Sequence, residues 1–102
     1  MRKHRLEAGP DSVHWGFFDA ALKPLITIES GDEVTMSTVS GPPEAMPRPD
    51  SGLTVPPALS AIHATVPRRL NGPHIMTGPV AVRGAKAGQV LEVRIQIGRA
   101  SL

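Results

Sequence analysis

The 102-residue chain contains no cysteine. This absence excludes disulfide bonds, thiolate nucleophiles and zinc sites with cysteine ligands. It also argues against a cupredoxin-like copper domain, because a blue-copper centre needs a cysteine ligand. A chain without cysteine is compatible with a reducing cytoplasm, and a cytoplasmic location is our prediction.

Aromatic residues and long apolar runs are also scarce. The three aromatics, Trp15, Phe17 and Phe18, lie within four residues of one another. Nucleic-acid-binding surfaces typically combine basic side chains with aromatic side chains on one face. The basic clusters at 2–5 and 68–69 are therefore interpreted as solvated surface, and no nucleic-acid partner is predicted. No run approaches the ~20 apolar residues of a membrane span. The basic start is not followed by the apolar stretch of a secretory signal, so neither a membrane partner nor a signal peptide is predicted.

Proline and glycine, in contrast, are abundant, with eleven and ten copies. Frequent proline and glycine residues disfavour long helices and favour short strands joined by turns. We therefore predict one segment, 1–102, that is mostly β. It should consist of short antiparallel strands and hairpins, with at most one or two short helices. Residues 42–57 form a Pro-rich loop, interpreted as an exposed insertion or as a lid or partner-contacting arm.

Four stretches are expected to be strands. Residues 25–29 and 34–39 alternate apolar and polar side chains around a turn at 30–32, which predicts a hairpin or a tight strand-turn-strand corner. Residues 79–82 form a short strand. Residues 90–97 give the clearest pattern, with one apolar face made of Leu91, Val93, Ile95 and Ile97. That pattern is typical of a half-buried strand.

The remaining segments are less regular. Residues 1–12 are polar and are expected to be frayed or lightly docked. Residues 58–66 carry apolar side chains at helical spacing, which predicts one short helix. Asp19 is expected to cap the turn that follows it, and Asp32 to brace its own turn. A further turn is predicted at 71–73.

Histidines are the main candidates for chemistry. His14 precedes Trp15 and can be interpreted as a packed residue bonded to the backbone, or as a pocket-lining base, orienter or metal ligand. His74 lies in a rigid segment and leaves the same alternatives open. His63 lies on the predicted helix and is interpreted as an ordinary surface or boundary residue, and His4 is given no role. The sequence has no HExxH motif, phosphate-cradling loop, dinucleotide fingerprint or GxSxG elbow.

Three stretches together resemble the acetamidase/formamidase family. Residues 13–41 contain a histidine-tryptophan-glycine group, a proline-led strand, a serine-glycine-aspartate turn and a second strand. Residues 72–85 contain glycine-proline-histidine and then threonine-glycine-proline, and residues 87–98 a glycine turn that leads into a strand. Their order and spacing agree with the family. Gln89 stands where the family usually has aspartate, and Ala87 where it often has proline, which we expect to affect only that turn.

The resemblance implies the amino-terminal part of a larger amidase domain, whose strands form part of a β-sandwich or barrel-like sheet. It implies hydrolysis of the carbon–nitrogen bond of short linear amides to carboxylate and ammonia, in a cytoplasmic homo-oligomer. It also implies a divalent metal such as zinc in the full-length enzyme, with no ligand assignable within this chain. His14 and His74 are then candidate pocket residues of a segment that is inactive alone. The alternative is a small, non-catalytic β-rich binding or assembly module.

Overall fold

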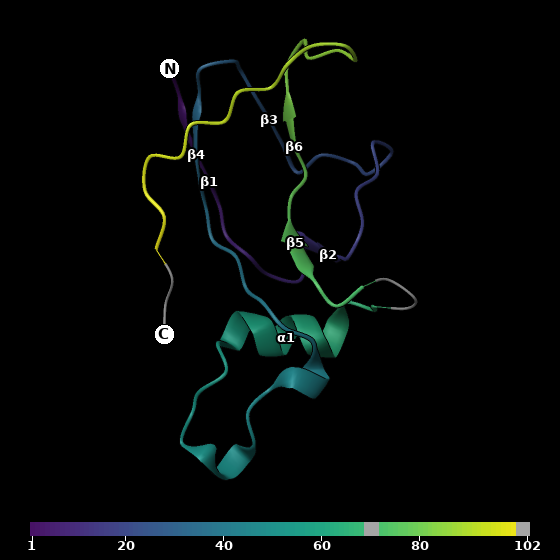
Figure 1. Ribbon diagram of the computed structural model, residues 1–102, viewed down its shortest axis with the longest axis vertical. Coiled ribbons are helices and arrows are strands. Elements are labelled where there is room, and N and C mark those ends of the chain that lie inside the picture. Colours follow the sequence, from purple (N-terminus) through teal and green to yellow (C-terminus); the bar gives the residue numbers. More distant parts are fainter. Residues whose placement is uncertain (69–71, 100–102) are drawn as a thin grey trace.

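The computed structural model describes residues 1–68 and 72–99. This part of the chain forms six short strands and one α-helix, joined by turns and loops (Figure 1). The strands pair two by two, β1 with β4, β2 with β5, and β3 with β6. The mostly β character is confirmed at this level. Arg69 of the second basic cluster and Asn71 of the predicted turn lie outside the described residues.

The amino-terminal segment forms a paired strand. Strand β1 (Lys3–Leu6) runs parallel to β4 (Glu33–Met36), and the Ser37 N–H extends the ladder by donating to the Leu6 carbonyl at 3.0 Å. The expectation that residues 1–12 are frayed or lightly docked is therefore wrong for β1. Backbone hydrogen bonds and the burial of Leu6 hold the strand, whereas the side chains of Lys3 and Arg5 are exposed and contribute to its polar sequence.

The turn at 30–32 is a corner and not the centre of a hairpin. The Asp32 N–H donates to the Glu29 carbonyl at 3.0 Å, and Gly31 adopts φ +91°, which favours glycine. Strand β3 (Ile26–Ile28) then pairs with β6 (Val80–Val82) and not with β4. This confirms the corner alternative of the prediction.

Two of the three strand pairs are parallel, so the prediction of antiparallel strands is wrong for them. The β1–β4 and β3–β6 pairs are parallel, and the β2–β5 pair is antiparallel. Parallel partners must come from distant parts of the chain. Local alternation and turn residues carry no information about such partners, which is why the sequence favoured hairpins.

The Asp32 side chain joins the corner to the amino terminus. Its carboxylate accepts hydrogen bonds of 2.9 Å from the Arg2 and Glu29 N–H groups and from Nε2 of His4. The Arg2 N–H, followed by the Glu29 N–H and then His4, holds the pKa of the Asp32 carboxyl well below its ordinary value of 3.8. Asp32 therefore braces its turn, as predicted, and it also fastens β1 beside β4.

We expect Asp32→Asn to lower the urea midpoint at pH 7, because an amide cannot accept from all three donors and would place its own N–H₂ group against them. Since folding lowers the pKa of Asp32, its stabilisation is complete above the unfolded-state pKa and is lost as the pH falls through the folded-state value. The wild-type midpoint should therefore approach that of the variant between about pH 4 and pH 2. Asp11→Asn, at an exposed acid, is the control. An equal loss in both variants at pH 7 would contradict the bracing role.

Helix α1 (Pro57–Thr65) confirms the helix predicted over 58–66. It begins at a proline, which is favourable in the first turn because its missing N–H needs no intrahelical partner. It buries Leu59 and Ile62, three residues apart on one face. His63 donates from Nε2 to the Gly41 carbonyl at 2.9 Å, so the helix holds the start of the Pro-rich loop.

The Pro-rich segment, residues 42–57, lies outside the three sheets of the described residues. It contains two single turns of 3-10 helix, Pro43–Ala45 and Pro49–Ser51, and ends where Pro57 begins the helix. None of the helices in the described part of the chain is long and apolar enough to cross a bilayer.

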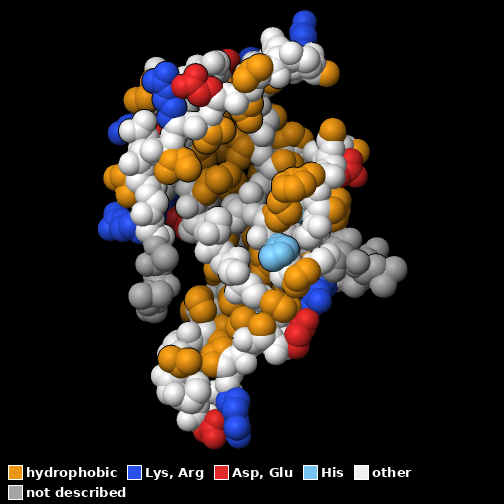
Figure 2. Space-filling view, viewed as in Figure 1, with side chains coloured by type: hydrophobic (Ala, Val, Ile, Leu, Met, Phe, Trp, Pro, Cys, Tyr) orange, Lys and Arg blue, Asp and Glu red, His pale blue; other side chains and the backbone are white. Residues whose placement is uncertain are grey.

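Among the residues that the structure describes, only four large apolar side chains are buried, namely Leu6, Trp15, Leu59 and Ile62. The radius of gyration is 15.5 Å, whereas a compact domain of this length has about 13 Å. Figure 2 accordingly shows apolar side chains across much of the visible face and in the hollow between the strands. The described part of the chain is thus an open assembly of strand pairs with a small core.

The predicted strand at 90–97 does not form within the described residues. The segment runs as a trace without a paired strand (Figure 1), and all of its residues are exposed. A strand is stable only when its backbone groups find partners, and the described chain offers none here. The expectation of a half-buried strand is wrong for that reason, although the alternating sequence pattern remains.

Candidate functional site

Two of the family-like motifs meet in the structure. Strand β2 (Val13–Trp15) pairs antiparallel with β5 (Ile75–Thr77). The Gly16 N–H extends this pair by donating to the His74 carbonyl at 2.8 Å. A histidine-tryptophan-glycine group is therefore joined through its backbone to a glycine-proline-histidine group about sixty residues further along the chain.

Gly16 makes this junction possible. Its φ is +68°, and a Cβ placed on it would lie 2.8 Å from the carbonyl oxygen of Gly72 and 2.9 Å from its Cα, with the Gly72 nitrogen in contact as well. A side chain at position 16 would thus collide with backbone, which cannot rotate away. The tight approach requires glycine both for its conformation and for its lack of a side chain.

Trp15 has a structural role where β2 and β5 meet. Its ring is 2% exposed, and its Nε1 donates to the Val66 carbonyl at 3.2 Å. His63 stacks on the ring with 6.2 Å between centroids, and the Arg68 guanidinium lies 5.7 Å from the ring centre. His63 is half-buried and packs on Trp15, and Trp15 connects β2 to the end of α1.

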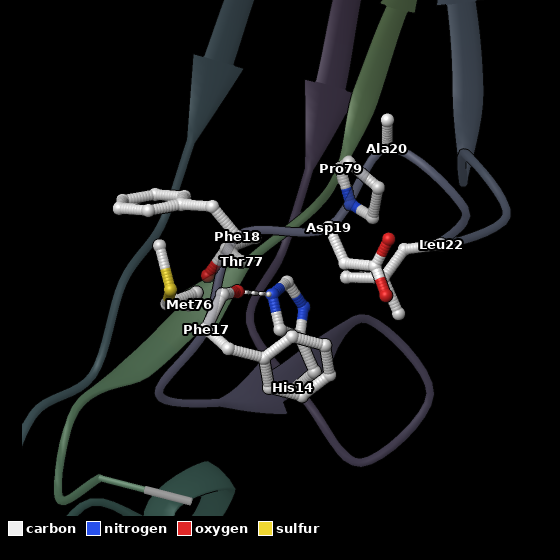
Figure 3. Close-up of a pocket in the computed structure, with 9 residues that line it drawn as sticks. All are labelled: His14, Phe17, Phe18, Asp19, Ala20, Leu22, Met76, Thr77 and Pro79. Carbon is white, nitrogen blue, oxygen red and sulfur yellow. Dashed lines mark hydrogen bonds between the residues drawn. The ribbon is translucent and has the colours of Figure 1, made fainter.

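His14 lies on the other side of β2, because successive side chains of a strand alternate between its faces. It lines an open cavity of about 380 Å³. The cavity is mostly apolar and is drawn in Figure 3. Its lining comes from the segment after β2 and from β5 and its continuation: His14, Phe17, Phe18, Asp19, Ala20, Leu22, Met76, Thr77 and Pro79.

One hydrogen bond determines the tautomer of neutral His14. Its Nε2 lies 3.1 Å from the Phe17 carbonyl oxygen, and a carbonyl can only accept, so Nε2 carries the proton. The lone pair of the neutral ring then lies on Nδ1. The Phe17 ring meets the imidazole edge-on, with centroids 5.5 Å apart. His14 is thus bonded to the backbone and also lines the cavity, and a role as base, orienter or metal ligand stays a prediction.

Asp19 is the acidic residue of the cavity. Its Oδ1 accepts from the Ala21 N–H at 2.8 Å, and its carbonyl accepts from Leu22 at 3.1 Å. This confirms the predicted cap of the following turn. In Figure 3 the second ring nitrogen of His14 is turned away from the Phe17 carbonyl, on the side where the Asp19 carboxylate lies. The cavity therefore contains one base and one acid on an apolar wall.

The other histidines lie elsewhere. The His74 side chain is exposed and is not among the residues that line the cavity, although its backbone holds Gly16. His4 bonds to Asp32, a role that the sequence did not suggest. The sequence placed Phe17 and Phe18 near His14 but did not indicate that all three share one cavity with Asp19. Their nearness in sequence to His14 was the available signal, but the cavity forms only because the segment after β2 folds back toward His14.

Histidine and acidic side chains, the usual protein ligands of divalent metals, are spread over the described part of the chain. Within residues 1–68 and 72–99, no group of three or more histidine or acidic side chains gathers closely enough to hold a metal ion. His14 and Asp19 are two donors at most, whereas a catalytic zinc site uses three protein ligands. The donor set found here does not fit the metal that the family resemblance implies, so no chemical step is assigned to a metal.

Comparisons of the chain with protein-family models, with curated proteins and with solved structures find no match.

Proposed function

We propose that residues 1–102 are the amino-terminal segment of an amide hydrolase that acts on short linear amides and releases carboxylate and ammonia. The observation that carries this proposal is the junction of the motifs on which the resemblance rests. The segment at 13–16 is fastened to the segment at 72–77 by the β2–β5 pair and by the bond from Gly16 to His74. Both motifs then contribute side chains to the His14 cavity.

The fold that we propose for the complete domain is a β-sandwich or barrel-like sheet. Three two-stranded sheets leave several strand edges for further pairing. The radius of gyration exceeds that of a compact domain of this length. Both features support a segment that other strands complete. A cytoplasmic location and homo-oligomeric assembly belong to the same proposal.

In this proposal His14 forms one wall of the amide pocket and acts as a proton acceptor. Amide hydrolysis needs an activated water, a stabiliser for the oxyanion and an acid for the departing nitrogen. Nδ1 of His14 can accept a proton from water, because Nε2 is engaged with Phe17. The apolar wall excludes bulk water from one side of a bound amide. The oxyanion stabiliser and the acid for the departing nitrogen would come from outside these residues. His74, whose side chain is exposed in this chain, is a candidate for a part of the pocket that other residues of the enzyme would enclose.

The test is ammonia release from formamide and acetamide, by this chain and by a form extended through any reading frame that continues past residue 102. We expect release only from the extended form. In that form His14→Ala should lower kcat by about 10²–10⁴-fold if His14 is the base, whereas Lys23→Ala, at an exposed loop residue, should not change it. Circular dichroism would verify that both variants fold.

Other outcomes would contradict parts of the proposal. Release by the 102-residue chain would refute the incomplete site. Equal kcat values for wild type and His14→Ala would remove His14 from the chemistry. No release by either form would favour the second candidate, a non-catalytic β-rich binding or assembly module, which is supported by the exposed apolar side chains of residues 90–97.

A further inference from the structure

The exposed segment 90–97 has the chemistry of a strand without a partner. Its five apolar side chains are between 73% and 96% exposed. Its polar side chains, Glu92, Arg94 and Gln96, occupy the alternate positions. Arg94 donates from Nε to Oε1 of Glu92, so these two charges lie on one side of the extended chain. A turn in which the Gln89 N–H donates to the Lys86 carbonyl at 3.3 Å precedes the segment.

The order of these residues makes the segment complementary to a second, antiparallel copy of itself. If Val93 lies opposite Val93 of the second copy, Leu91 of each copy faces Ile95 of the other. The same register places Glu92 of each copy opposite Arg94 of the other. Opposite charges and β-branched pairs directly across an antiparallel ladder are both stabilising. One register thus satisfies the apolar face and the charged face together.

Neighbouring registers do not share this property. Centring the pair on Glu92 places two carboxylates opposite each other, and centring it on Arg94 does the same to two guanidinium groups. A parallel, in-register pair places both kinds of like charge side by side. Like charges directly opposite are destabilising. Charge complementarity therefore selects the antiparallel register centred on Val93.

We infer that residues 90–97 are a self-association strand, through which two copies of this chain pair antiparallel about Val93. The pairing supplies backbone hydrogen bonds that the described chain does not, and it buries the apolar face, which is the mode of β-strand addition. It does not depend on the proposed amide hydrolysis. An interface of this size is at the weak end of specific interfaces, so the expected dissociation constant is on the order of 10–100 μM.

Sedimentation velocity of the wild-type chain from roughly 5 to 500 μM, a range that brackets this constant, should show a monomer–dimer equilibrium. Glu92→Arg and Arg94→Glu should each weaken the homodimer by about tenfold, because each turns two attractive cross-strand pairs into repulsive ones. An equimolar mixture of the two variants should dimerise as well as wild type, since each charge then meets its opposite. Both positions are exposed, so folding should not change.

Lys23→Glu is the matched control for Arg94→Glu, because it changes the net charge equally at an exposed residue outside the segment. A monomer at every concentration would overturn the inference. The inference would also be overturned if Glu92→Arg and Arg94→Glu weakened the dimer no more than Lys23→Glu does. It would equally be overturned if the equimolar mixture of the two charge variants failed to restore association. A dimer paired in parallel and in register would place like charges opposite each other in the wild type as well. Each charge variant would then associate about as weakly as the wild type, and this outcome would also overturn the inference.

The lack of cysteine permits a second measurement that does not rely on affinity. In the proposed register, Val93→Cys places two thiols directly opposite each other across the two-fold axis. Mild oxidation should therefore give a covalent dimer at least about tenfold faster than Lys23→Cys, because cross-strand Cβ atoms lie about 4.5–5.5 Å apart and need little movement to form a disulfide. Equal rates would contradict the register.

Discussion

Trp15→Ala is expected to remove a large part of the free energy of unfolding of the chain. Removing a large buried aromatic side chain costs about 3–5 kcal/mol, and most natural domains have a total stability of only about 5–15 kcal/mol. Trp15 is one of four large buried side chains, and the substitution also leaves the Val66 carbonyl without its indole donor. Urea denaturation followed by far-UV circular dichroism would measure the loss.

Two further variants separate the contributions of Trp15. Phe18→Ala removes an aromatic side chain that is 91% exposed, and it should change the free energy of unfolding by no more than about 0.5 kcal/mol. Trp15→Phe keeps most of the apolar ring but loses the N–H, and it should cost about 1–3 kcal/mol because a buried carbonyl loses its partner. A loss below about 1 kcal/mol in Trp15→Ala, roughly the uncertainty of such measurements, would mean that the ring is not part of the core.

Gly16→Ala should lower the free energy of unfolding by about 2–5 kcal/mol. About 1–2 kcal/mol comes from forcing an alanine into the left-handed region. A further 1–3 kcal/mol, roughly, comes from overpacking, because the new methyl group meets the Gly72 backbone. The expected movement would separate β2 from the residues before β5, so the His14 cavity should be altered in the same variant. Chemical shifts of the His14 ring would report that change.

Gly52→Ala is the matched control. Gly52 also has a left-handed φ, +79°, but a Cβ there meets nothing within 4 Å. This variant should cost only the conformational part, about 1–2 kcal/mol, and should leave the His14 ring signals in place. Equal losses at the two positions would show that the contact between Gly16 and Gly72 is not tight.

Local patterns predicted the elements whose partners are near in sequence. The helix at 58–66 followed from apolar residues at helical spacing, and the structure begins it one residue earlier, at Pro57. The turn at 30–32 followed from glycine and aspartate, and the loop at 42–57 from its prolines. These features depend on backbone preferences and side chains within a few residues, which the sequence states directly.

The candidate site was predicted only in part. His14 beside the aromatics indicated a pocket, and the structure places it in a cavity with Phe17 and Asp19. The sequence did not separate His14 from His74, because a structural and a functional interpretation stayed open for both. Only the β2–β5 pairing distinguishes them, since it turns His14 toward the cavity and uses His74 through its carbonyl.

The sequence by itself therefore determined the mostly β character, the single helix, the Pro-rich loop and the alternating pattern of residues 90–97. The tertiary structure decided the parallel pairing of β1 with β4 and β3 with β6, the bond between His4 and Asp32, and the exposure of 90–97. The physical reason is that strand partners are chosen by backbone hydrogen bonds between distant segments. Those bonds are the same for nearly every residue type, so the sequence carries almost no record of which partner is chosen.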